Sequence, residues 1–201
     1  MKVVHAPFPS LGFDTVCPIN EHTAPALKAA GMSFAIRYLG SVTSGELDII
    51  LNAGLLFMPV TFSRSPGWVP TTGMGIVDGK KDVEHLTQAG IPTGVSVWID
   101  LEGVNGPANM VSEWVNDRAG VLSSAGYIPG LYVGSGCVLN ADQLYALRVT
   151  HYWKSLSMAP EPHCGFCMIQ LYKTTTVAGV EVDCDVICHD YKDRLPIMVS
   201  A

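Results

Sequence analysis

Apolar residues gather in short runs that are rich in β-branched side chains and end at Gly, Pro or Asp. Such runs are typical of β-strands. They are nearly continuous rather than alternating, as expected where both faces of a parallel sheet are covered. We therefore expect eight strands, at Leu11–Asp14, Ser33–Tyr38, Leu55–Phe62, Gly94–Glu102, Ile128–Val133, His151–Ser155, Met168–Tyr172 and Val180–Val186.

Segments with a helical spacing of apolar residues lie between several of these strands. Thr43 or Ser44 and Asn140 are suitable N-caps, and Pro107 suits an early helical position. The pattern predicts helices at Thr23–Ala30, Ser44–Ala53, Val77–Ala89, Pro107–Ala125 and Ala141–Leu147.

A helix that ends at Ala-Gly and leads into a buried strand recurs four times, in KAAGMSFAIRY, LNAGLLFMPV, TQAGIPTGVSVW and SSAGYIPGLYV. Glycine commonly closes a helix in the left-handed conformation, so this phrase marks the loop of a repeated β/α unit. Eight strands and five helices favour an α/β fold, a (β/α)8 TIM-type barrel with short or missing helices in the C-terminal part. The alternative is an open doubly wound sheet, although the nucleotide-binding motifs typical of that fold are missing from the sequence.

The composition indicates one globular domain. Of 201 residues, 48% are hydrophobic and 15% are charged, which is enough apolar surface for a substantial core. We expect a single catalytic domain over residues 1–201, with its core at about residues 11–186 and a short C-terminal tail. The 12 Lys and Arg against 18 Asp and Glu give a formal net charge of −6, which argues against nucleic acid or an anionic membrane as a partner.

Acidic residues stand at the ends of three expected strands. Asp14 closes the first strand, Asp100 and Glu102 close the fourth, and Asp183 and Asp185 lie in the last. In a barrel of parallel strands these positions meet at one rim, and residues i and i+2 lie on one face about 6.6 Å apart. Clustered carboxylates repel, so one should hold its proton near neutrality, as glycoside hydrolysis requires. The plainer interpretation makes these residues caps or solvated loop acids.

The ordered strand motifs resemble a known family. GFDT, FAIRYLG, AGLLFMPV, VWIDLEG, GYIPGLYVG, YWKS, IQLY and VDCDV look like successive strands of the lysozymes of glycoside hydrolase family 25. They are closer still to the related glycoside-hydrolase-like barrel domain of bacteria and phages. The resemblance runs from about Leu11 to Val186. It implies hydrolysis of the β-1,4 bond between N-acetylmuramic acid and N-acetylglucosamine in peptidoglycan.

The resemblance also implies a role for each acid. Glu102 would be the general acid that protonates the leaving oxygen. Asp100 would orient the acetamido group of the substrate, which acts as internal nucleophile, or stabilise its charge. Asp14 and Asp183 would bind and polarise the sugar on the opposite wall. Asp185 occupies a place where the lysozymes often have Asn.

Arg37 is typical of the glycoside-hydrolase-like relatives rather than of many family 25 enzymes. We expect it to pair with Asp14 or Asp183 at the rim, or to bind sugar, because a buried Arg without an acid is costly. Aromatic rings stack on the apolar faces of sugars, although core packing is an equal alternative for Trp98. The expected substrate-binding residues are Arg37, Trp98, Tyr132, Trp153, Gln170 and Asp185, with Trp68 and Tyr172 as further aromatic candidates.

The cysteines suggest a competing interpretation. Cys164-x2-Cys167 and Cys184-x3-Cys188 approach the spacing of a structural zinc site. However, Cys184 lies between two inward-facing acids and should point to the helix layer. We expect reduced thiols, no metal and no cofactor.

We therefore expect a peptidoglycan-degrading glycosidase, lysozyme-like and of the N-acetylmuramidase type, that works as a monomer without a nucleic-acid or membrane partner. Residues 1–14 do not resemble a signal peptide. This fits a phage endolysin that is made in the cytoplasm and acts on the bacterial cell wall after release. The alternatives are a non-catalytic glycan-binding or structural barrel, and a zinc-stapled interaction domain.

Overall fold

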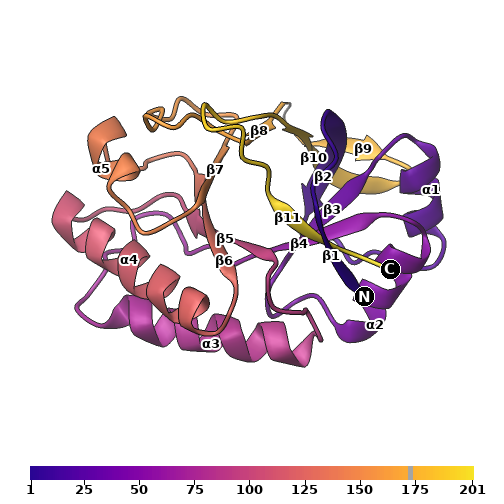
Figure 1. The fold of residues 1–201 in the computed structure, drawn as a ribbon, viewed down its shortest axis with the longest axis horizontal. Helices are drawn as coiled ribbons and strands as arrows, with labels where there is room; N and C mark the ends of the chain where they lie inside the picture. The colour runs from indigo at the N-terminus through magenta and orange to yellow at the C-terminus, as the bar shows by residue number, and fades with distance from the viewer. Residues whose placement is uncertain (172–173) are drawn as a thin grey trace.

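The computed structural model describes residues 1–171 and 174–201, and its centre is a closed eight-stranded barrel (Figure 1). Each strand pairs with the next around the barrel, and the pairings of β4 with β5 and of β2 with β10 complete the ring. The barrel strands are β2 (Ser10–Thr15), β3 (Phe34–Tyr38), β4 (Leu56–Val60), β5 (Ser96–Leu101), β6 (Ile128–Val133), β7 (His151–Lys154), β8 (Met168–Gln170) and β10 (Val180–Ile187). The TIM-type barrel is confirmed, and the open doubly wound sheet is excluded.

Helices follow the first strands of the barrel and are short or missing after the later strands, as predicted. They are α1 (Thr23–Ala29), α2 (Ser44–Asn52), α3 (Met74–Gln88), α4 (Ala108–Ser124) and the short α5 (Ala141–Tyr145). The glycine of each Ala-Gly phrase has a positive φ, for example 93° at Gly31 and 88° at Gly126. These left-handed residues end the helices where the sequence predicted. Across the described residues, no helix has the length and apolar character that crossing a membrane requires.

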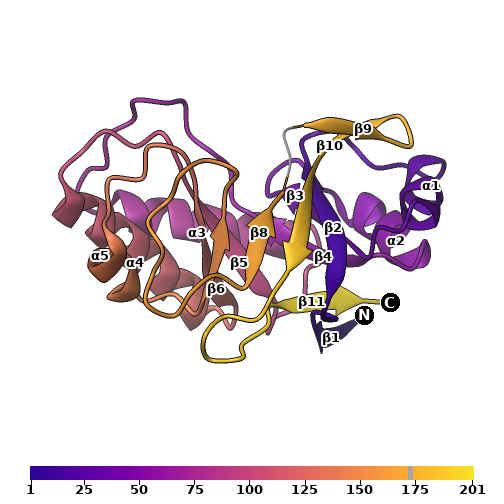
Figure 2. The same ribbon diagram turned by 90° about the horizontal axis from the view of Figure 1, so that it is seen from above.

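Helices α3 and α4 lie side by side along one flank of the barrel (Figures 1 and 2). A Cβ atom at Gly75 would collide with the backbone oxygen of Trp114, and one at Gly79 would lie 2.8 Å from Val121 Cβ. The two glycines are one helical turn apart, so they form a flat strip against which α4 packs closely. Gly75 and Gly79 therefore serve helix packing.

The last barrel strand corrects the expectation of a wholly parallel barrel. Strand β10 runs antiparallel to both of its neighbours, β2 and β8. It also forms a hairpin with β9 (Thr175–Val177). Strand β8 ends at Gln170, and Tyr172, which was expected in this strand, lies outside the described residues.

The two ends of the chain form an additional pair of strands. Strand β1 (Lys2–His5) pairs with β11 (Ile197–Ser200), and β11 also contacts β4 (Figure 2). Ala6 and Met198 are buried in the same cluster as the barrel interior. The C-terminal segment, expected as a short tail beyond the core, is thus part of the core.

Two apolar layers result from the alternation of side chains along the strands. One layer fills the barrel interior and includes Phe34, Ile36, Trp98 and Trp153. The other lies between the barrel and the helices, where Phe13, Ala35 and Phe57 belong to the same cluster as Leu27, Ile50 and Leu122. The interior is a packed core, as is usual for such barrels, so a ligand site is confined to the rim.

Candidate active site

The five predicted acids converge on one mouth of the barrel. Asp14 lies near the end of β2, Asp100 near the end of β5, and Glu102 directly after it. Asp183 and Asp185 come from β10, and Asp183 is paired in register with Asp14. Because β10 is antiparallel, Asp183 reaches this rim from the first half of its strand rather than from the end.

Gln170 connects the acids of the first and last strands. Its Nε2 donates to Asp183 Oδ2 at 2.8 Å and to Asp14 Oδ2 at 3.4 Å. Its Oε1 accepts hydrogen bonds from the Leu156 N–H at 3.0 Å and from the Tyr132 hydroxyl at 3.3 Å. These four bonds fix the orientation of the amide, and the side chain holds the acids rather than facing an open cleft.

Two of the acids are buried without a compensating cation. Asp185 is 0% exposed, and its Oδ1 accepts a hydrogen bond from Trp153 Nε1 at 2.9 Å. Asp100 is 4% exposed, and neither of its carboxyl oxygens has a hydrogen-bond partner within the described residues. A carboxylate in such surroundings is costly, so the protonated form is favoured.

The acids therefore differ in protonation. Burial, followed by the charge of Glu102, raises the pKa of Asp100 well above its usual range, and Arg118 opposes this rise. Burial and then the charge of Asp183 raise the pKa of Asp14 to about 7. Burial raises the pKa of Glu102 as well. The mouth can thus hold proton-bearing and ionised carboxyl groups together near neutrality, as the sequence predicted.

Glu102 is more accessible than Asp100, since it is only half-buried. It lies against Gly134, where an added Cβ atom would come within 3.1 Å of Glu102 Oε2 and collide with Glu102 Cβ. Glycine is therefore required at that position for Glu102 to keep its place. The backbone oxygen of Glu102 accepts a hydrogen bond from Trp68 Nε1 at 2.9 Å.

Two of the expected aromatic sugar contacts are corrected by their burial. Trp98 and Trp153 are 0% and 1% exposed, and their rings pack together in the barrel interior. They offer no face on which a sugar could stack. Tyr132 remains half-buried at the mouth, with its ring 4.5 Å from Trp153. Of these aromatic rings, only that of Tyr132 is placed to face a ligand.

Arg37 faces away from the mouth, contrary to expectation. Its Nε donates to Glu46 Oε1 at 2.7 Å, and its Nη1 donates to the Thr15 backbone oxygen at 2.6 Å. Ile36 lies in the barrel interior, so the alternation of the strand turns Arg37 toward helix α2. The same Glu46 oxygen accepts the Ile19 N–H, so this buried pair fixes the loop that follows Asp14.

Two residues of the site were missed. Tyr38 ends strand β3 at the mouth, and its pKa is raised by burial and then by four of the acids, beginning with Asp14. Thr61 is buried after β4, and its hydroxyl oxygen accepts the Asp100 backbone N–H at 3.0 Å. The signal for Tyr38 was available in the sequence, because it lies two residues beyond Ile36 on the same face.

The zinc hypothesis loses its support. Cys164, Cys167, Cys184 and Cys188 are free thiols, and in the described part of the chain no group of three or more His, Cys, Asp or Glu side chains could hold a metal. Cys184 packs in the layer between barrel and helices, as its place between Asp183 and Asp185 predicted.

A barrel of this topology, with acids clustered at one mouth, is the architecture of the glycoside hydrolase-like domains. The chain belongs to the Rv2525c-like, glycoside hydrolase-like domain family, whose model matches residues 25–185. No curated protein sequence matches the chain significantly.

Solved structures agree on the fold. The Tat-secreted protein Rv2525c of Mycobacterium tuberculosis, crystallised with L-tartrate, superposes with a TM-score of 0.71 at 17% sequence identity. The alignment covers 90% of this chain and 98% of the Rv2525c chain. An uncharacterized B. stearothermophilus protein has a TM-score of 0.69 at 17% identity, with coverage of 92% and 99%. A lysozyme from Streptomyces coelicolor has a TM-score of 0.61 at 16% identity, with coverage of 89% and 91%. The fold is therefore glycoside hydrolase-like and close to that of lysozymes.

Proposed function

We propose that the protein hydrolyses the glycan strand of peptidoglycan as a lysozyme-like enzyme of the N-acetylmuramidase type. The observation that carries the proposal is the pair Asp100–Glu102 at the mouth, with Asp14 and Asp183 on the facing strands. One accessible acid beside a buried one is the arrangement that acid-assisted glycoside cleavage requires. The lysozyme-like fold supports peptidoglycan as the substrate.

Glu102 is the general acid in this proposal. It is the half-buried member of the pair, and burial raises its pKa, which favours the protonated form that a general acid needs. It gives that proton to the glycosidic oxygen as the bond from this oxygen to the anomeric carbon breaks. Water later attacks the anomeric carbon, displaces the acetamido oxygen of the substrate that has meanwhile bonded to it, and gives a proton to Glu102, which restores the acid.

Asp100 assists the reaction from its buried position beside Glu102. Its two carboxyl oxygens are buried without a partner among the described residues, so an acetamido N–H of the substrate that reaches them would satisfy an otherwise unpaired group. The carbonyl oxygen of that group bonds to the anomeric carbon while the glycosidic bond breaks, and positive charge develops on it. This positive charge favours ionisation of Asp100, which burial keeps protonated in the free protein; Asp100 releases its proton to solvent, and the carboxylate then stabilises the charge.

The test is the substitution Glu102→Gln assayed on purified peptidoglycan. Gln keeps the size and polarity of the side chain but cannot deliver a proton, so we expect a rate loss of about 10²–10⁴-fold with little change in the thermal midpoint. Mass spectrometry of the released ends identifies the bond cleaved. Glu113→Gln, an exposed change on α4, is the matched control. Wild-type turnover in Glu102→Gln would refute the proposal and leave a glycan-binding barrel.

We propose further that the enzyme works as a monomer on the bacterial cell wall after release from the cytoplasm, as a phage endolysin does. Sedimentation of the purified protein and lysis of intact cells from outside would test these two points.

A further inference from the structure

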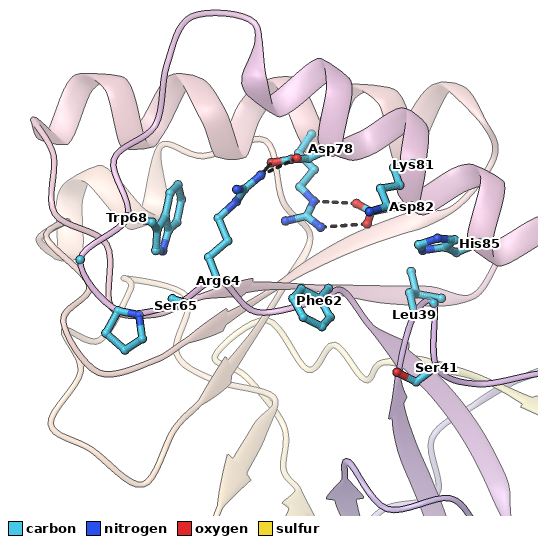
Figure 3. Close-up of a pocket in the computed structure, with 14 residues that line it drawn as sticks. Leu39, Ser41, Phe62, Arg64, Ser65, Trp68, Asp78, Lys81, Asp82 and His85 are labelled. Atoms are coloured by element: carbon cyan, nitrogen blue, oxygen red, sulfur yellow. Dashed lines mark hydrogen bonds and ion pairs between the residues drawn. The ribbon is translucent and has the colours of Figure 1, made fainter.

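A cavity opens next to the segment that carries Glu102. It has a volume of about 870 Å³ and lies between the β4–α3 loop, helix α3 and the turn after β3 (Figure 3). None of the five acids lines it. The residues that matter for its chemistry are Leu39, Phe62, Arg64, Trp68, Lys81 and His85.

One wall of this pocket is bonded to the segment that carries Glu102. Trp68 Nε1 donates to the Glu102 backbone oxygen at 2.9 Å, and the Gly67 N–H donates to the Gly103 oxygen at 2.7 Å. At the back of the pocket, Arg118 is near enough for its charge to act on the pKa of Asp100. The pocket and the acidic pair are therefore neighbours, and a ligand extended along the rim can occupy both.

The back of the pocket is neutral because its cations are paired. Arg118 donates to both carboxyl oxygens of Asp82, at 2.6 and 2.8 Å, and this pair is buried. Arg64 donates to both oxygens of Asp78, at 2.6 and 2.7 Å (Figure 3). These charges are already compensated, so they hold the wall in place.

Two basic side chains of the pocket are not paired with an acid among the described residues. Lys81 and His85, one turn apart on α3, have no hydrogen-bond or ion-pair partner among residues 1–171 and 174–201. Gly40 has φ of 83°, and an added Cβ there would lie 2.8 Å from His85 Cε1. The imidazole thus rests on the turn after β3 at the edge of the pocket (Figure 3). The pocket is locally basic in a chain whose net charge is −6.

The pocket also has apolar lining residues. Phe62 is 66% exposed, and Leu39 and the Trp68 ring line the same space. The Arg64 guanidinium lies 5.5 Å from the centre of the Trp68 ring, which stiffens both side chains. A ligand for this pocket therefore carries an anionic group near apolar atoms. Because both Arg–Asp pairs are neutral, the pocket offers an anion only Lys81 and the His85 imidazole, which suit a single carboxylate better than a dianion such as phosphate.

We propose that this pocket binds a carboxylate on a short, partly apolar chain, and that in the substrate this chain is the acidic peptide attached to the glycan. Naming the peptide rests on the proposed function, whereas the carboxylate site stands on the pocket itself. Lys81 and His85 would bind the carboxylate, and Phe62 and Trp68 would contact the aliphatic atoms. The pocket would then select glycan strands that still carry their peptides.

The experiment compares two soluble peptidoglycan fragments in calorimetric binding to the Glu102→Gln variant, which does not degrade them. One fragment carries its free peptide carboxylates, and the other has them converted to amides. We expect the acidic fragment to bind about tenfold more tightly, as one charge-assisted contact allows. Lys81→Ala with His85→Ala should remove this preference. Lys80→Ala, an exposed neighbour on α3 that does not line the pocket, should preserve it.

Equal binding of the two fragments, or an unchanged preference in the double variant, would overturn the proposal. Displacement of the acidic fragment by inorganic phosphate but not by acetate would overturn the carboxylate assignment. Lys81→Ala alone serves if the double variant fails to fold, since Lys81 is exposed. Because binding is measured without cleavage, a preference in a protein that cleaves nothing would keep this site while refuting the proposed hydrolysis.

Discussion

Buried carboxyl groups of the α3–α4 flank and of the barrel mouth have different surroundings. Between α3 and α4, Asp82 is held by Arg118 through two hydrogen bonds. In the barrel mouth, Asp100 and Asp185 are equally buried, yet no described cation lies within hydrogen-bonding distance of them. The first arrangement satisfies the charge, whereas the second favours a retained proton.

The difference separates structure from chemistry. A paired buried acid resists change, because removing either partner leaves the other charged and unsatisfied. An unpaired buried acid is free to gain or lose a proton when a substrate alters its surroundings. The unpaired acids of the mouth therefore lower the stability of the fold but can react, whereas the paired Asp82 of the α3–α4 flank stabilises it.

The largest effect is expected from breaking the flank pair. Arg118→Ala leaves Asp82 as an isolated buried charge and should lower the free energy of unfolding by about 3–5 kcal/mol. Urea denaturation measures this change. Arg148→Ala, which removes an exposed Arg, should stay within about 0.5 kcal/mol of the wild type. A loss as small as that of the control would contradict the contrast between the two regions.

A substitution in the mouth should instead reduce activity strongly and change stability little. Asp100→Asn keeps the shape of a side chain that is already largely protonated, so the free energy of unfolding should stay the same or rise slightly. Turnover on peptidoglycan should fall by about 10²–10³-fold, because Asn cannot ionise when positive charge develops on the substrate. A variant that is destabilised as strongly as Arg118→Ala, but active, would place Asp100 in a structural role.

Much of this fold was predictable because its signals are local. The Ala-Gly phrases end helices through glycine geometry, and the apolar runs mark the strands in order. The direction of β10 was not predictable, since a strand with inward Asp183 and Asp185 has the same alternation whichever way it runs. Pairing partners, rather than local pattern, determine that direction.

The site was predictable in its acids but less so in their surroundings. The alternation of FAIRY places Arg37 opposite Ile36 and Tyr38, so its outward direction could have been inferred from the sequence. The burial of Trp98 and Trp153 depends on their depth in the barrel, which the sequence does not encode locally. The basic pocket is formed partly by a loop without periodicity, and no pattern indicates it.

The smallest expected effect concerns the dependence of stability on pH. The pKa of Asp14 is raised from 3.8 to about 7 in the folded protein. Between these values the native state binds more protons than the unfolded state, so the contribution of Asp14 to stability is full below pH 4 and lost as pH rises through 7. Lowering the pH from 8 to 5 should therefore add about 3 kcal/mol from Asp14 to the free energy of unfolding. In Asp14→Asn this contribution should disappear, whereas those of Asp100 and Asp185, whose pKa values are also raised, should remain. Urea midpoints at the two pH values measure the difference, and an identical pH dependence in wild type and Asp14→Asn would show that Asp14 does not retain its proton in the mouth.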